Sequence, residues 1–147
     1  MTAPMVAPSL APLHAAVLAA LRSRIPRVGD MGAPEGDPPY AFLSRTDTRW
    51  SGSLANPHEM VTAVFQVQCV ALDSAGVDWL EHRARLALAL PPVAEGWLVL
   101  RYLPPDGPGG IRVDRDVTPH LAFSTPEWRV TAQPGSPYTS AFTSTFA

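Results

Sequence analysis

Hydrophobic positions in residues 8–24 repeat with the period of an α-helix. Ser9 precedes the repeat, where its hydroxyl can cap the helix, and Pro12 falls in the first turn, where a missing N–H costs little. Pro26 then stops the helix. These signals predict an amphipathic helix whose buried stripe consists of Leu10, Leu13, Val17, Leu18, Leu21 and Ile25.

From Met60 the pattern changes to strict alternation, which is typical of a half-buried strand. Thr62, Gln66 and Gln68 mark the wetter face. The expected buried face is formed by Val61, Ala63, Phe65, Val67, Cys69 and Ala71. Upstream, "YAFLS" (Tyr40–Ser44) predicts a short strand, and "RTDTRWSGSLANPHE" predicts a polar excursion between the two strands.

A second helix is expected at about residues 75–90, between the cap Asp73-Ser74 and the stop Pro91-Pro92. Glu81 and Arg85 are spaced for an i, i+4 pair on its outer surface, with Asp78 and Arg83. Its inner stripe includes Val77, Leu80, Ala84 and Leu88.

The last third is rich in strand signals. Residues 96–103 and 111–118 predict two strands, the second with Ile111, Val113 and Val117 inward, and residues 120–132 predict one more that is interrupted or bent at Pro126. The element order is α-β-β-α-β-β-β. The apolar stripes of the two helices must be buried, and packing both on one face of a sheet achieves this. We therefore predict an α+β fold in which a mixed, mainly antiparallel sheet is packed on one face by two helices.

We divide the chain into a single domain at residues 1–130 and an extended C-terminal arm at residues 131–147. The arm is dominated by Ser, Thr and small residues, with Tyr138, Phe142 and Phe146 spaced four apart. Two interpretations stay open for it: disorder, or an aromatic arm that docks on a neighbouring subunit.

Composition narrows the classes of partner. The chain has 147 residues and a formal net charge of −2, which argues against nucleic acid as the main partner. No signal peptide and no apolar stretch long enough to cross a bilayer is apparent, so we expect a soluble intracellular protein. Its single cysteine, Cys69, cannot form an internal disulfide, and we expect it to act as a small buried hydrophobe.

Candidate chemistry is sparse. The four histidines show no metal-ligand spacing, and the acids Asp30, Glu35 and Asp37 do not match a calcium loop. The glycine-rich loop "VGDMGAPEGDPP" follows a helix and carries acids, so it would repel a phosphate. We therefore predict no catalytic residues, no cofactor and no metal, and interpret this loop as a joint between helix and strand.

The order and spacing of these segments resemble the tail-terminator, or tail-completion, proteins of long-tailed bacteriophages, particularly those of actinobacterial phages. The resemblance covers roughly residues 7–118. It is carried by the loop "PRVGDMGAPEGDPPYAFLS" with its strand Pro39–Leu43, by the strand residues Phe65–Val70, and by Asp78–Arg85 on the second helix.

This resemblance implies a structural virion protein that forms a hexameric ring, caps the tail tube, stops tube polymerisation and joins tail to head. Its expected partners are further copies of itself, the major tail tube protein and a head-closure or neck protein. DNA would pass through the lumen without specific binding, and no membrane is involved. Assembly in the host cytoplasm and a place at the neck end of the virion tail follow from the same resemblance.

Ring contacts are expected on charged and aromatic segments, because a heterologous ring buries a different patch on each side of every subunit. The candidates are Arg112, Asp114, Arg115 and Asp116 with Tyr138, Phe142 and Phe146. Two alternatives stay open: another neck or tail component (head-closure, tail-completion or tube protein), and a small enzyme or ligand-binding domain whose site the sequence does not reveal.

Overall fold

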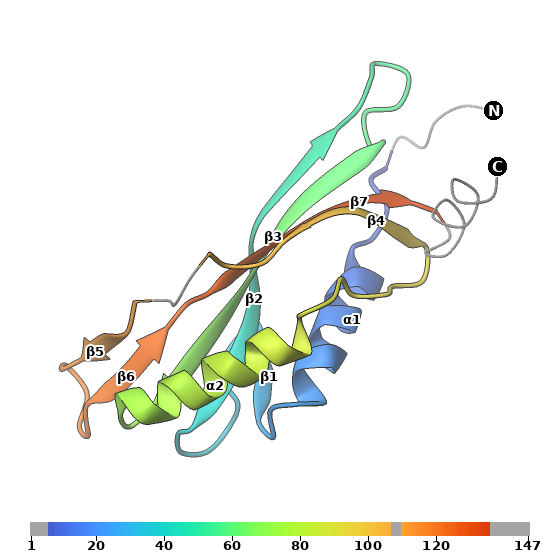
Figure 1. Cartoon of the computed structure of the whole chain (residues 1–147). Coiled ribbons are helices and arrows are strands. Elements are labelled where there is room, and N and C mark those ends of the chain that lie inside the picture. The colour runs from blue at the N-terminus through green and yellow to red at the C-terminus, as the bar shows by residue number, and fades with distance from the viewer. Residues whose placement is uncertain (1–5, 107–109, 136–147) are drawn as a thin grey trace.

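The computed structural model describes residues 6–106 and 110–135. Two helices lie on one face of a single sheet of seven strands, most of them antiparallel, which confirms the predicted α+β class (Figure 1). The elements in chain order are α1 (Ala11–Arg22), β1 (Val28–Asp30), β2 (Tyr40–Ser51), β3 (Met60–Ala71), α2 (Ser74–Ala87), β4 (Trp97–Leu103), β5 (Arg112–Asp114), β6 (Leu121–Ser124) and β7 (Glu127–Pro134).

Helix α1 begins and ends close to the predicted signals. Pro12 lies in the first turn, but the N-cap residue is Leu10 and not Ser9, whose Oγ accepts a hydrogen bond from Ala11 N–H at 3.2 Å just before the helix. All six residues of the predicted stripe are buried. The stripe faces the sheet, where it meets Phe65 and Trp128 in the core.

Strands β2 and β3 form a long antiparallel hairpin that extends beyond α1 (Figure 1). The prediction that β2 ends at Ser44 was wrong, because the strand continues to Ser51 through half of the predicted polar excursion. Residues 45–51 are mostly exposed, so burial does not explain the extension. Backbone pairing with the regular strand β3 explains it, with a bulge between Arg45 and Asp47 absorbing the irregularity.

The predicted interruption at Pro126 is present, and it divides the sheet into two parts. Strand β6 pairs with β3 at Cys69–Ala71, whereas β7 pairs with β3 at Val61–Gln66. Between them, Pro126 C=O accepts a hydrogen bond from Val67 N–H at 3.0 Å. One part of the sheet therefore has the order β1-β2-β3-β6-β5, and the other has the order β2-β3-β7-β4.

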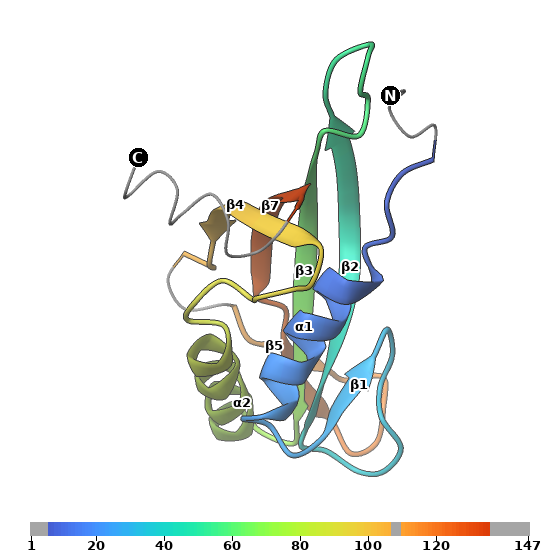
Figure 2. The same ribbon diagram turned by 90° about the vertical axis from the view of Figure 1, so that its right-hand side faces the viewer.

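Helix α2 is capped as predicted, since the Asp73 carboxylate accepts a hydrogen bond from Gly76 N–H at 2.8 Å. Its predicted inner stripe is buried. The prediction that Glu81 lies on the outer surface was wrong: Glu81 is only 6% exposed and faces the sheet. Turning Figure 1 by 90° shows both helices side by side in front of the strands (Figure 2).

Two predictions about the last third need correction. Strand β5 has three residues, so Asp116 is not on it, and Val113 and Val117 are 48% and 38% exposed instead of inward. Strand β5 lies at the far end of the sheet, beyond the helices (Figure 1). Strand β7 continues to Pro134, past residue 131 where we placed the start of the arm.

Candidate interaction surfaces

Four of the predicted contact residues gather at one end of the sheet. Arg112 and Asp114 lie on β5, opposite Phe123 and Leu121, and Arg115 and Asp116 follow in the next turn. Three of the four side chains are exposed and Asp114 is half-buried. Asp114 Oδ1 accepts a hydrogen bond from Asp116 N–H at 3.0 Å, so it shapes the turn. Their predicted role in subunit contacts stays a prediction.

The aromatic residues of the predicted arm, Tyr138, Phe142 and Phe146, lie outside the described residues. The prediction that they contact a neighbouring subunit therefore stays a prediction.

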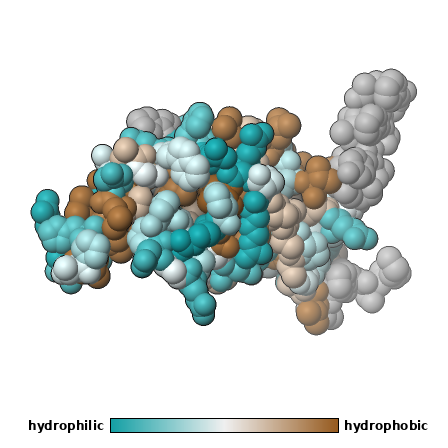
Figure 3. Space-filling view, turned by 90° about the horizontal axis from the view of Figure 1, so that it is seen from below, coloured by the Kyte–Doolittle hydropathy of each residue, from teal (hydrophilic) through white to brown (hydrophobic). Residues whose placement is uncertain are grey.

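Sequence reasoning missed an apolar hollow beside β5. It has a volume of about 390 Å³ and lies between the turn after β5, the end of β3 and the loop before β2. Viewed from below, hydrophobic atoms collect at this end of the molecule (Figure 3). Its walls include Pro38, Leu72, Val117, Pro119 and Leu121. The signal was hidden because these residues come from three separate stretches of sequence.

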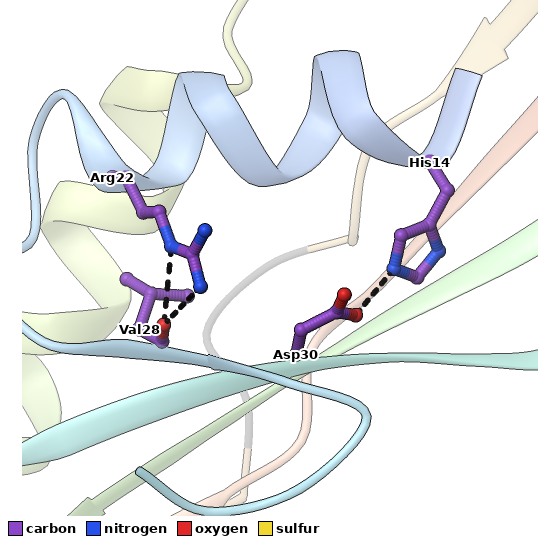
Figure 4. Close-up of polar contacts among 4 residues, drawn as sticks. All are labelled: His14, Arg22, Val28 and Asp30. Carbon is purple, nitrogen blue, oxygen red and sulfur yellow. Dashed lines mark hydrogen bonds and ion pairs between the residues drawn. The ribbon is translucent and has the colours of Figure 1, made fainter. Parts of the chain in front are cut away.

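The glycine-rich loop joins α1 to β2, but its first three residues form strand β1, which the predicted order α-β-β-α-β-β-β lacks. Of its acids, the Asp30 carboxylate is used within the fold. Asp30 Oδ1 lies 2.7 Å from His14 Nε2, which ties β1 to α1, and the Arg22 guanidinium donates to Val28 C=O from the same helix (Figure 4). Farther on, Arg27 donates hydrogen bonds to the backbone carbonyls of Glu35 and Asp37. Within the described ranges, no group of three or more His, Cys, Asp or Glu side chains is placed to hold a metal ion.

A hollow of about 440 Å³ beside α1 holds the residue types of a Ser-His-Asp arrangement, namely Ser9, His14 and Asp30. A nucleophilic serine needs a hydrogen bond to the histidine that activates it. Ser9 Oγ is instead the acceptor for Ala11 N–H, and no hydrogen bond joins Ser9 to His14 in the described part of the chain. The hollow therefore does not show a nucleophile paired with its base.

A polar cluster lies buried between α2 and the sheet. Glu81 Oε1 accepts from Arg85 at 2.9 Å, and Glu81 Oε2 accepts from Ser124 Oγ on β6 at 3.0 Å. Arg85 also donates to Pro105 C=O at 3.3 Å. Burial, together with the nearby Glu81 carboxylate, raises the pKa of the Cys69 thiol to about 12. The thiol is therefore neutral at physiological pH, in keeping with the predicted structural role of Cys69.

The face of the sheet away from the helices is polar and open. Thr62 and Thr131 are hydrogen-bonded to each other across β3 and β7 at 3.1 Å. Asp47, Arg49 and Arg129 line a hollow of about 270 Å³ on the same face. Positive and negative side chains are mixed there, so this surface lacks the dense basic character that phosphate neutralisation requires.

None of the described helices is long and apolar enough to span a membrane. No family model matches the sequence, and no curated protein sequence matches it. Among solved structures, the chain is similar to "Structure of bacteriophage SPP1 gp17 protein", with 19% sequence identity and a TM-score of 0.48. The similarity covers 84% of this chain and 91% of that one. A likeness at this identity and TM-score does not define a family for the chain.

Proposed function

We propose that this chain is a structural protein of the tail of a long-tailed bacteriophage. In this proposal it forms a hexameric ring at the end of the tail tube, stops tube polymerisation and presents the surface that joins tail to head. Further copies of the chain, the tail tube protein and a head-closure or neck protein are its partners, and DNA passes through without specific binding.

The observation that carries the proposal is the way the resembling segments fit together in space. Pro39–Leu43 begins β2, Phe65–Val70 lies in β3 beside it, and Asp78–Arg85 lies in α2, which packs on β3 and β6. Three short stretches with weak individual motifs thus form one continuous structural unit. Such a unit explains why their order and spacing are recognisable although each stretch is short.

The shape and surface support an assembly role. The β2–β3 hairpin and the β5–β6 end project from opposite ends of the helix-covered core (Figure 1). Large apolar side chains are exposed at both ends, with Leu54 at the hairpin tip and Leu72 beside the apolar hollow. Different surfaces at the two ends suit a head-to-tail contact between identical subunits.

Labelling purified phage tails for this chain, followed by electron microscopy, tests the proposal. We expect label at one end of the tube only, and tubes of uncontrolled length when the gene is inactivated. Label along the whole tube would overturn the terminator role in favour of a tube protein, and absence from particles would overturn the virion role itself.

A further inference from the structure

In the part of the sheet with the order β2-β3-β7-β4, both marginal strands have an outer edge that no other described strand covers, while β1 and β5 are the margins of the other part. Strand β1 pairs with β2 only at Ala41–Leu43, so the outer edge of β2 is open from Arg45 to Ser51. Strand β4 pairs with β7 on one side and is open on the other. The outer edge of β4 is used once within the described residues, where Trp97 N–H donates to Ala94 C=O at 3.2 Å. No backbone hydrogen bond outside the strand ladders involves Thr48, Trp50 or Tyr102 there. Unpaired strand edges are templates for pairing with another strand.

The direction of individual backbone groups follows from the ladders. Val67 N–H donates to Pro126 C=O, on the side of β3 away from β2. The backbone groups of successive residues in an antiparallel strand point alternately to its two sides. The N–H and C=O groups of Val64 and Thr62 therefore point towards β2. Their partners Asp47 and Arg49 face β3 in turn. Thr48 and Trp50 alternate with Asp47 and Arg49 along β2. Their backbone groups therefore point to the open edge.

The same reasoning applies to β4. Val130 and Ala132 of β7 lie opposite Ala63 and Val61 of β3, whose backbone groups point away from β2 and towards β7. The backbone groups of Val130 and Ala132 therefore point towards β3, and those of Thr131, between them, point towards β4. The backbone groups of its partner Arg101 point towards β7, so the N–H and C=O groups of the next residue, Tyr102, point to the open edge. Each edge thus offers free donors and acceptors to an extended strand.

These two edges belong to the same part of the sheet and lie at its opposite margins. In the order β2-β3-β7-β4, β2 and β4 are antiparallel. A second copy placed beside the first can therefore continue the sheet with an antiparallel pair, the β2 edge of one copy meeting the β4 edge of the next. Such a contact is heterologous, and repeating it generates a ring or an open filament.

Charge and exposure favour this pairing. Asp47 and Arg101 carry opposite charges on the open face of the sheet, where they lie beside Val64 and Thr131 in the ladders. Within the subunit Asp47 already forms an ion pair with Arg49, Nε to Oδ2 at 3.0 Å, so Arg101 of the next copy would join that pair. Arg101 is exposed and makes no side-chain hydrogen bond or ion pair with another described residue. Leu100 and Leu103 on β4 are 46% and 39% exposed, so pairing would also cover apolar surface.

We infer that β2 (Arg45–Ser51) of one subunit pairs with β4 (Trp97–Leu103) of the next, so that the sheet runs continuously between copies of this chain. This inference deepens the proposed ring and rests on it only for the number of subunits. Bulges and charged side chains are also features that protect an edge strand from pairing, and both strands have a bulge and arginines. If they protect these edges, the cross-linking experiment below will give no chains of linked subunits.

Cysteine cross-linking of the full-length chain separates the two outcomes. The double variant Thr48→Cys/Leu100→Cys is treated with a short bifunctional maleimide, and the native Cys69 does not react because it is fully buried. We expect a ladder of three or more linked chains. Each single variant should give no ladder, and a mixture of the two single variants should stop at dimers, because one link uses both cysteines.

The matched control is Thr48→Cys/His82→Cys, which moves one thiol to the exposed outer surface of α2. A Thr48→Cys/Leu100→Cys ladder no stronger than this control, both in solution and in purified particles, overturns the inference. Dimers from Thr48→Cys alone also overturn it, because they mean that β2 pairs with β2 in an isologous contact.

A second variant tests backbone pairing directly. With the thiols placed at Thr46→Cys and Leu100→Cys, Thr48→Pro removes the outward N–H while leaving the β3 ladder intact, and edge strands tolerate proline there. We expect Thr48→Pro to abolish the ladder and Thr48→Ala to retain it. Equal ladders from both would show that side chains alone make the contact and would overturn the strand pairing. A ladder from a chain absent from phage tails would leave this inference standing and refute the proposed function.

Discussion

Replacing Arg85 with methionine tests whether the buried Glu81 carboxylate depends on its guanidinium partner. The Glu81 side chain is 8% exposed and the Arg85 side chain is 31% exposed. Methionine keeps much of the apolar stem of arginine but removes the guanidinium, whereas the Ser124 hydroxyl still donates to the carboxylate. The substitution therefore removes the charge that compensates Glu81, with little change in packing.

The expected loss follows from the geometry. Breaking a buried ion pair by removing one partner costs about 3–5 kcal/mol. Because Arg85 is nearly one-third exposed, water can enter where its guanidinium was, and we expect a loss of about 2–3 kcal/mol. Ser124→Ala removes a hydrogen bond to a charged acceptor and should cost about 1.5–3 kcal/mol.

The sharper test is the double variant Glu81→Met/Arg85→Met. It removes the buried charge as well as its partner, so we expect it to be more stable than Arg85→Met alone. Urea unfolding followed by tryptophan fluorescence measures the midpoint and slope, since Trp97 and Trp128 are buried reporters. A double variant less stable than Arg85→Met, at unchanged slope, would refute the reasoning that taking the guanidinium away from the buried carboxylate causes the loss.

Three further predictions concern the joint, the thiol and the arm. Gly29→Ala should cost about 1–3 kcal/mol in urea unfolding, because a Cβ there would lie 2.0 Å from Gly32 O; Gly32→Ala, with open space around it, should cost much less. The free energy of unfolding should fall above pH 9 by up to about 1.4 kcal/mol per pH unit. The reason is that the Cys69 thiol loses its proton near pH 9 in the unfolded chain but keeps it to about pH 12 in the folded one. Cys69→Ala should reduce this decline when unfolding is measured as a function of pH. Deleting Ser136–Ala147 should weaken ring assembly in native mass spectrometry without lowering the thermal midpoint; a deletion from Gln133 would also damage β7, so it cannot separate the two effects.

The sequence predicted the elements whose pattern is dictated by one buried face. The six-residue stripe of α1 and the alternating face of β3 are both buried as expected, because each repeats over enough turns or strand positions to define a direction. The bend at Pro126 was also predictable, since proline lacks the N–H that a central strand needs.

Features that depend on a partner strand or helix were not predictable. The polar half of β2 has no apolar signal, and its strand conformation comes from pairing with β3. Glu81 has the spacing of a surface pair with Arg85, and the hydrogen bond from Ser124, 43 residues away, could not be read from that spacing. The apolar hollow at the β5 end draws its walls from three distant segments, so no local window contains it.

The two open edges and the closed core have different consequences for assembly. Trp128, Phe65 and Leu13 are buried within one subunit, so the chain has a core that does not require a neighbour. Edge pairing then has only to align two strands that are already formed, which avoids the cost of folding on binding. A single such contact can be weak, yet closure of a ring makes the last contact intramolecular and raises its effective concentration. Variants at the β2 and β4 edges should therefore change assembly while leaving the unfolding midpoint of the isolated subunit unchanged, whereas Arg85→Met is expected to lower that midpoint.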